Sequence, residues 1–148
     1  MPTPKTRAAD PIAVTVAGRV AGVAKAAVIR AARTVLHGER RAARLSIAFV
    51  GPGRIRALNA RWKHADRPTD VLAFSLREPD GTLVGDVYLC RAVAAREAAS
   101  RGIPIREELL RLVVHGTLHV LGYDHPEDER RTRSSMWRRQ ERYLSCLR

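Results

Sequence analysis

Apolar and polar residues alternate in several short stretches of this chain, which is the pattern of a β-strand that buries one of its faces. The segment 45–49 reads Leu-Ser-Ile-Ala-Phe, so that every second residue is large and apolar. The sequence Pro79-Asp80-Gly81 is typical of a tight turn and predicts a hairpin between the strands on either side of it. Strands are predicted at residues 12–16, 45–49, 71–76 and 83–90.

Between and after these strands, apolar residues recur every three or four positions, which predicts helices. A strand–helix–strand order favours parallel pairing, and the hairpin adds an antiparallel strand. We therefore expect an α+β fold in a single domain spanning residues 1–148, with a small mixed sheet of about four strands packed with about five helices. Residues 1–11 hold three prolines and no periodicity, and we expect a flexible arm there. Helices are predicted at residues 18–36, 54–63, 91–100, 104–121 and 127–147.

The charge of the chain is strongly positive. It has 27 Lys and Arg residues against 15 Asp and Glu, which gives a net charge of +12. Such a surface favours a polyanion, and nucleic acid is the usual one, with an anionic membrane surface as the competitor. No apolar stretch approaches the roughly 18–20 residues of a membrane span, and the two cysteines match no metal or redox motif. We expect a cytoplasmic protein without a membrane partner.

The most specific chemical signal is a cluster of three histidines. His115 and His119 are four residues apart and share one face of the predicted helix. Gly122 offers a left-handed end to that helix, so that the chain can fold back and bring His125 to the same point. Three imidazoles with an open fourth position are typical of a catalytic zinc site. We predict one zinc ion per chain, held on a zincin-like helix.

The spacing of these histidines is that of the metzincin signature H-E-x-x-H-x-x-G-x-x-H, with Gly122 at its glycine. The glutamate that serves metalloproteases as general base is replaced by Gly116, which cannot accept a proton. A metalloprotease is therefore the weaker alternative. Our further hypothesis is that Gly116 removes bulk beside the site and admits a larger or more anionic substrate.

The segment from His115 to His125 resembles the signature of the YbeY family of bacterial endoribonucleases and rRNA maturation factors. The blocks 58–75 and 85–90 are similar to two other blocks of that family, and Met136 and Glu141 fit its C-terminal helix. The resemblance covers roughly residues 45–144. It implies a zinc-dependent, single-strand-specific endoribonuclease that acts in 16S rRNA 3′-end maturation and in ribosome quality control. Its partners would be rRNA and the small ribosomal subunit, with a ribosomal protein and a partner exoribonuclease as further candidates.

The resemblance carries the three metal ligands onto His115, His119 and His125. Where the family usually has an arginine, this chain has Lys63, which keeps the positive charge but loses the planar, bidentate grip on phosphate. We expect Lys63 to hold the phosphate, and the neighbouring Arg61 is an alternative. The nucleophile on the RNA phosphodiester would be water at the open zinc position or the RNA's own 2′-OH, and the sequence favours neither.

Several acidic residues have both a chemical and a structural interpretation. Asp124 precedes the third ligand and would accept a proton from the attacking water or orient a ligand, or it would only cap the turn. For Asp70, after Thr69, a turn role is favoured over catalysis. Asp86 lies within a predicted strand and would face either the cleft or a nearby backbone group.

The predicted C-terminal helix is rich in arginine, and few acidic residues offset this charge. We expect it to present a basic stripe to RNA. A non-catalytic ribosome-assembly factor with a structural zinc would explain the same charge and remains the alternative from another functional class. The arginines of this stripe are Arg130, Arg131, Arg133, Arg138, Arg139 and Arg142.

Overall fold

The computed structural model describes residues 11–18 and 21–148, so the arm predicted at residues 1–11 lies outside the described residues except for its last position. Four strands form one sheet in the order β1-β2-β4-β3. The β1–β2 and β2–β4 pairs are parallel, and β3 and β4 form the antiparallel hairpin, which confirms the predicted mixed sheet. The strands are β1 Ile12–Ala17, β2 Ala43–Phe49, β3 Val71–Arg77 and β4 Leu83–Leu89.

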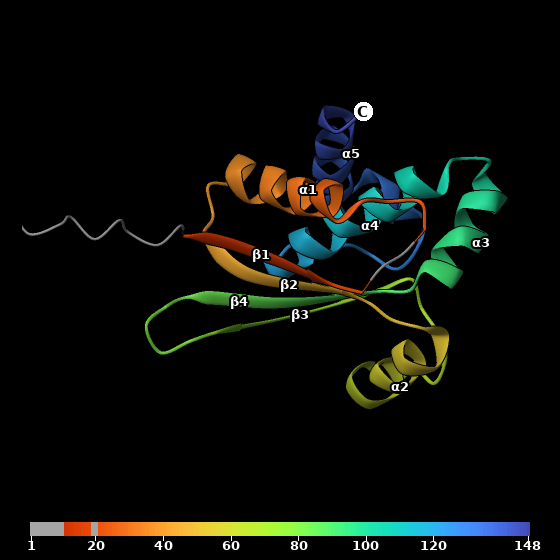
Figure 1. Cartoon of the computed structure of the whole chain (residues 1–148), viewed down its shortest axis with the longest axis horizontal. Coiled ribbons are helices and arrows are strands. Elements are labelled where there is room, and N and C mark those ends of the chain that lie inside the picture. The colour runs from red at the N-terminus through yellow and green to blue at the C-terminus, as the bar shows by residue number, and fades with distance from the viewer. Residues whose placement is uncertain (1–10, 19–20) are drawn as a thin grey trace, which may run out of the picture.

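Helices cover the two faces of the sheet unequally. Figure 1 shows α1, α4 and α5 stacked on one face, α3 packed beside α4 at one end of the sheet, and α2 alone on the opposite side. No helix in the described part of the chain is long and apolar enough to cross a membrane. The helices are α1 Lys25–Gly38, α2 Pro52–Lys63, α3 Arg91–Arg101, α4 Ile105–Val120 and α5 Ser135–Cys146, with a short 3-10 helix, η1, at Glu129–Arg133.

The central helix α4 lies against β4 at very close range, because two glycines remove the side chains that would keep them apart. A Cβ on Gly116 would lie 2.7 Å from Val87 Cγ1, and one on Gly85 would lie 2.4 Å from Val120 Cγ1. Helix α4 also contacts α1, α3 and α5, so most of its side chains are buried. It is therefore a rigid support for whatever its C-terminal half carries.

The opposite side of the sheet has a much smaller core. Ile55, Leu72 and Cys90 are its buried residues, and Phe74 and Tyr88 pack against them with part of their surface exposed. Helix α2 buries only Ile55 and Asn59. This helix therefore projects from the molecule, held by few contacts.

The helix predicted at 18–36 begins later than expected. Gly18 and Gly22 have φ angles of 86° and 100°, which lie outside the helical region, and α1 starts only at Lys25. A Cβ on Gly22 would lie 2.9 Å from Ile105 Cγ2, so the start of α4 packs directly over this turn. Residues 21–24, directly before Lys25, are therefore not helical.

The prediction of a single helix at 127–147 is also wrong, because the helical structure is interrupted at Ser134. Ser134 is extended, with φ −72° and ψ 156°, and its hydroxyl accepts a hydrogen bond from the backbone N–H of Trp137 at 3.1 Å. This is an N-cap, and it starts α5 as a separate helix. Asp128 caps η1 in the same way through the N–H of Arg130, at 2.9 Å.

Candidate functional site

The end of α4 turns the chain back as the sequence predicts. Gly122 has a φ of 100°, in the left-handed region that favours glycine. Its N–H donates to the carbonyl of His119 at 2.9 Å, and the N–H of Tyr123 donates to that of Leu118 at 3.1 Å. This closes the helix as a Schellman-type end and returns the chain toward the sheet. His125 is thereby brought beside the helix.

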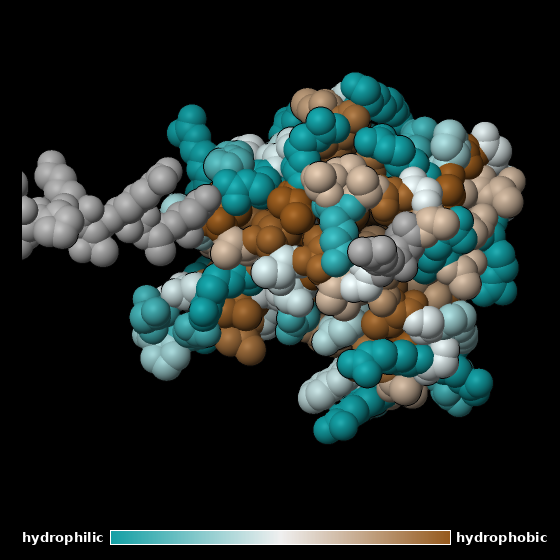
Figure 2. Space-filling view, viewed as in Figure 1, coloured by the Kyte–Doolittle hydropathy of each residue, from teal (hydrophilic) through white to brown (hydrophobic). Residues whose placement is uncertain are grey.

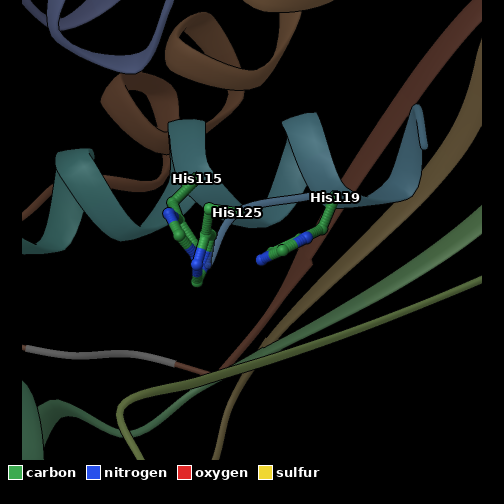
Figure 3. Close-up of side chains that lie close together, drawn as sticks. All are labelled: His115, His119 and His125. Carbon is green, nitrogen blue, oxygen red and sulfur yellow. The ribbon is translucent and has the colours of Figure 1, made fainter. Parts of the chain in front are cut away.

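The three predicted ligands converge on one point. Figure 3 shows His115 and His119 extending from α4 and His125 from the returning loop, with the rings pointing toward one another. The ring centroids are 4.6 Å apart for His115 and His119, and 5.1 Å apart for each of the other two pairs. One ligand atom from each residue lies within 4.8 Å of the other two. The geometry therefore agrees with the predicted metal-ligand set.

A hydrogen bond fixes each ring through its Nδ1 atom. His115 Nδ1 lies 2.6 Å from Gln140 Oε1, His119 Nδ1 lies 2.9 Å from the carbonyl oxygen of Tyr123, and His125 Nδ1 lies 2.9 Å from that of Pro126. A carbonyl oxygen can only accept, so each Nδ1 carries the proton. Each Nε2 then keeps its lone pair free for a metal, as in histidine–carbonyl pairs around zinc.

The hydrogen bond to His115 continues into a buried polar chain. Gln140, which is 1% exposed, donates through Nε2 to Glu141 at 3.2 Å. Arg111 donates to Glu141 at 3.1 Å and to the buried Glu108 at 3.0 Å. Because every member has a partner, the amide of Gln140 has one orientation, with its oxygen toward His115.

A second buried group supports His119 through the backbone. The carboxylate of Glu39, which is 6% exposed, accepts hydrogen bonds from the hydroxyls of Tyr123 and Tyr143 and from Arg139 Nη1. Burial would raise the pKa of Glu39, but these hydrogen bonds and the charge of Arg139 hold it below its usual value. The ionised carboxylate anchors Tyr123, whose carbonyl in turn orients His119.

Burial favours the neutral form of two of these imidazoles, His115 and His119. Burial, together with the charges of neighbouring groups, lowers the pKa of His115 to about 3, against the hydrogen bond of Gln140. Burial also lowers the pKa of His119, with smaller contributions from the charges of His125 and Lys63. A metal therefore need not displace a proton from His115 or His119 at neutral pH, and the donor set of three imidazole nitrogens fits zinc.

The histidines form one wall of a cavity of about 690 Å³. The other side is built by α2 and the loop after it, and Lys63, at the end of α2, lines the cavity there. Lys63 Nζ lies 5.3 Å from the ring centroid of Phe74, whereas the guanidinium of Arg61 lies over Trp62, at 5.0 Å, and does not line the cavity. Of the two candidates for the phosphate, the geometry favours Lys63.

Three acidic residues line the cavity, Asp70, Asp124 and Glu127. Asp124 is exposed, and its Oδ1 accepts a hydrogen bond from the backbone N–H of His125 at 2.8 Å, which is the turn-capping role weighed above. Its proton-accepting role stays a prediction. Burial raises the pKa of Asp70, although backbone hydrogen bonds, the charge of Arg131 and Thr69 lower it. Asp70 therefore lies in the site itself and not only in a turn.

Comparison with known proteins decides the family. The family described as Endoribonuclease YbeY matches residues 17–148. The chain belongs to the YbeY family. A curated relative named Endoribonuclease YbeY from Rhizorhabdus wittichii is 41% identical over 98 residues, which cover 59% of this chain and 58% of the relative. One of the same name from an Anaeromyxobacter species is 50% identical over 93 residues, covering 60% of this chain and 48% of the relative.

The chain thus matches between about half and three fifths of the length of these curated YbeY relatives. The fold has a solved counterpart over a larger share. The solution structure of TM1509 from Thermotoga maritima superposes with a TM-score of 0.62 at 28% sequence identity, and it covers 90% of this chain and 88% of that protein. The resemblance found in the sequence and the α+β fold are both confirmed.

In this YbeY-family site, the hypothesis about Gly116 needs correction, and the open alternative for Asp86 is decided against the cleft. Gly116 does not open space for a substrate, because its missing side chain would point into the helix–sheet contact with Val87. Asp86 does not line the cavity. It alternates along β4 with the buried residues Gly85 and Val87, which face α4, so its side chain lies on the other face of the sheet.

The basic stripe predicted for the last helix is divided. The break at Ser134 separates the arginines of η1 from those of α5. Arg131 alone of the six lines the metal cavity, and its Nε is buried without a hydrogen-bond partner among the described residues. Arg139 instead pairs with Glu39, and Arg130 with Asp128. The six arginines therefore do not form one continuous stripe that could face RNA.

The sequence alone did not identify Gln140 and Arg131 as members of the site. Gln140 lies four residues after the buried Met136, so a helical period marks it as inward-facing, but not what it contacts. Arg131 has the same sequence context as the other arginines. Asn59, quoted only within a family block, is buried and donates to the carbonyl of Arg67 at 3.0 Å, which fixes the loop across the cavity.

Proposed function

We propose that this chain is a zinc-dependent endoribonuclease that cleaves single-stranded RNA. The observation that carries the proposal is one cavity with two kinds of wall. Three imidazoles converge on one side, and three basic side chains are among the other residues that line the cavity (Lys63, Arg67 and Arg131). A metal on one wall and cations on the other suit a phosphodiester, which must be held and must gain charge during cleavage. The name of the curated relatives supports the same reaction.

The residues present fit zinc better than other common metals. Three imidazole nitrogens without a thiolate or a bidentate carboxylate are the ligand set of catalytic zinc sites, which keep one position open. When bound, zinc would supply a water of lowered pKa and would stabilise negative charge on phosphate oxygens.

The protein's own groups would hold the RNA and move the proton. Lys63 and Arg131 would pair with phosphate oxygens, Lys63 as a point charge and Arg131 through its planar guanidinium. Asp124 is the proposed proton acceptor for the attacking group, and its position on the cavity wall supports that role. Asp70 is a second carboxyl in reach of the cavity, and its raised pKa suits a group that carries a proton.

The biological substrate we propose is the 3′ end of 16S rRNA during its maturation, together with rRNA of defective ribosomes. The net charge of +12 supports a large polyanionic partner such as the small ribosomal subunit. A ribosomal protein and a partner exoribonuclease complete the proposed set of partners. The proposed compartment is the cytoplasm, which agrees with the free thiols of Cys90 and Cys146.

The test is a cleavage assay on zinc-loaded protein with a single-stranded RNA and a hairpin RNA of the same composition. Wild type should cleave the single strand and spare the stem, and His115→Ala should cleave neither. Cleavage that persists in His115→Ala would contradict the assignment and indicate a contaminating nuclease. Folded, zinc-loaded wild type that binds ribosomal subunits but never cleaves RNA would instead favour the non-catalytic assembly factor.

A further inference from the structure

Trp62 is a large aromatic side chain in an unexpectedly exposed position. It is 57% exposed, and only Leu76, at 59%, matches it among the large hydrophobic side chains of the described residues. Trp62 lies in the last turn of α2, the helix that projects from the sheet. Figure 2 shows mainly hydrophilic side chains over that region and a surface hollowed between α2 and the β3–β4 hairpin. Burial therefore does not explain a tryptophan here.

The neighbours of Trp62 are aromatic and cationic. Its ring centroid lies 6.4 Å from that of Phe74 in an edge-on arrangement, and Phe74 lies 6.1 Å from Tyr88. The guanidinium of Arg61 lies 5.0 Å from the Trp62 ring. Aromatic rings interleaved with cations are how proteins bind single-stranded nucleic acid, because a base stacks on the ring while the cation attracts the backbone.

Phe74 also connects this group to the metal cavity. Lys63 Nζ lies 5.3 Å from the same Phe74 ring and lines the cavity, so Trp62 and Lys63 are next to each other both in sequence and around one ring. A phosphate at Lys63 therefore has a neighbouring nucleotide within reach of Trp62. We propose that Trp62 is the stacking platform for an unpaired base next to the phosphate that enters the metal cavity.

The charge of α2 favours RNA over a protein as the occupant of this surface. The helix carries three arginines and Lys63 but no acidic residue, and within the described residues only Arg56 of these forms an ion pair, with Asp66 at 2.8 Å. A base can stack on Trp62 only if it is not paired and stacked within an RNA duplex, so double-stranded RNA is disfavoured. The platform would thus supply the preference for single strands. This role rests on the proposed cleavage of RNA in the neighbouring cavity.

The experiment is single-turnover cleavage of a short single-stranded RNA by zinc-loaded protein over a range of protein concentrations. Trp62→Ala should raise the half-saturating concentration about 5- to 150-fold, the effect of losing one stacked base, with little change in the maximal rate. Trp62→Phe should restore most of the affinity. Leu76→Ala is the matched control, since it removes an equally exposed side chain at the far end of β3, and it should behave as wild type.

A series of RNAs with a single abasic position locates the base. In wild type one abasic position should cost the same factor as Trp62→Ala, and in Trp62→Ala that position should cost nothing more. An unchanged half-saturating concentration in Trp62→Ala would overturn the stacking role, and so would an abasic position that weakens binding equally in both proteins. Either result would favour a contact between Trp62 and another protein. If Trp62→Ala did not fold, a wild-type series without a sensitive position would overturn it as well. Wild type that cleaves no RNA at all would remove the proposed function together with the platform.

Discussion

The two walls of the cavity are built in opposite ways. The wall that carries the histidines belongs to α4 and the loop after it, with α5 packed behind, and His115 is 5% and Gln140 is 1% exposed. Each ligand ring is fixed by its own hydrogen bond. The wall that carries Lys63 belongs to α2 and its following loop, which buries only two residues and leaves Trp62 in solvent.

This difference follows from what each wall has to do. Metal ligands must be held to within a fraction of an ångström, and buried, fully paired side chains provide that precision. A flexible polyanion needs charge and stacking surface instead, and long exposed side chains adapt to it without a fixed core. We call the wall with the histidines the metal wall and the wall with Lys63 the substrate wall. Mutations on the metal wall should therefore impair metal binding, and mutations on the substrate wall should impair RNA binding and cleavage but not metal binding.

The largest effect should come from removing a ligand on the metal wall. In His119→Ala the zinc site loses one of three nitrogens, and cleavage should fall by about a thousandfold or more, because a bound metal contributes several kcal/mol to such a reaction. Zinc content per chain, measured by atomic absorption after dialysis, should fall in parallel. His37→Ala, an exposed histidine at the end of α1, is the control and should keep both.

A change behind the metal wall should have the next largest effect. Gln140→Leu removes the acceptor for His115 Nδ1, and zinc affinity should fall about 10- to 100-fold, as is usual when the partner of a ligand histidine is lost. Gln140→Glu keeps an acceptor oxygen and should restore most of the affinity. A competition titration against a zinc-binding dye measures both variants. Equal affinity for wild type and Gln140→Leu would mean that this hydrogen bond does not position the ligand.

The substrate wall should respond in the opposite way. Lys63→Ala should lower the cleavage rate about 10- to 100-fold, which corresponds to one hydrogen bond to a charged group, while zinc affinity stays at the wild-type value. Lys63→Arg should retain most of the activity, since it keeps the charge and adds a second donor. Rates and zinc titrations on the same samples test the separation. A loss of zinc affinity in Lys63→Ala as large as in Gln140→Leu would break the comparison.

A further effect, on stability and not on activity, is a pH dependence in the zinc-free protein. Burial lowers the pKa of His115 in the folded protein to about 3, from an ordinary value of 6.5. Between pH 6.5 and 3, His115 is therefore protonated in the unfolded chain but neutral in the folded protein. Stability from this group is complete above pH 6.5 and is lost as the pH falls toward 3, by at most about 1.4 kcal/mol per pH unit. Urea unfolding at a series of pH values gives the free energy of unfolding of wild type and His115→Asn. That free energy should depend less steeply on pH in the variant, and equal pH dependence in both proteins would contradict the lowered pKa of His115.

The sequence predicts the metal wall well because its signals are local. An i, i+4 pair of histidines and a glycine at the helix end fix three ligands through backbone geometry alone, and the structure brings them together as expected. The helix break at Ser134 could not be predicted from periodicity, because residues 127–135 contain no apolar residue, while the cap depends on one hydroxyl. Where the apolar pattern is absent, a single polar contact decides where a helix begins.

The rest of the site depends on contacts between distant residues. Gln140 reaches His115 across 25 positions, and Glu39 reaches Tyr123 across 84. No spacing rule marks such pairs, since only the packing of α1 and α5 against α4 creates them. Gly116 shows the same limit, because its place in the signature suggests chemistry while its surroundings demand only the absence of a side chain. Sequence patterns thus identify ligands more readily than their supports.

The proposed metal site is tested most directly by titrating metal-stripped protein with zinc while the initial rate of single-stranded RNA cleavage is followed. We expect no activity without metal, a rise in proportion to added zinc, and saturation at one zinc ion per chain, with His115→Ala inactive throughout. Cleavage by the metal-free protein, saturation at another stoichiometry, or zinc-dependent cleavage by His115→Ala would contradict a single metal site at His115, His119 and His125.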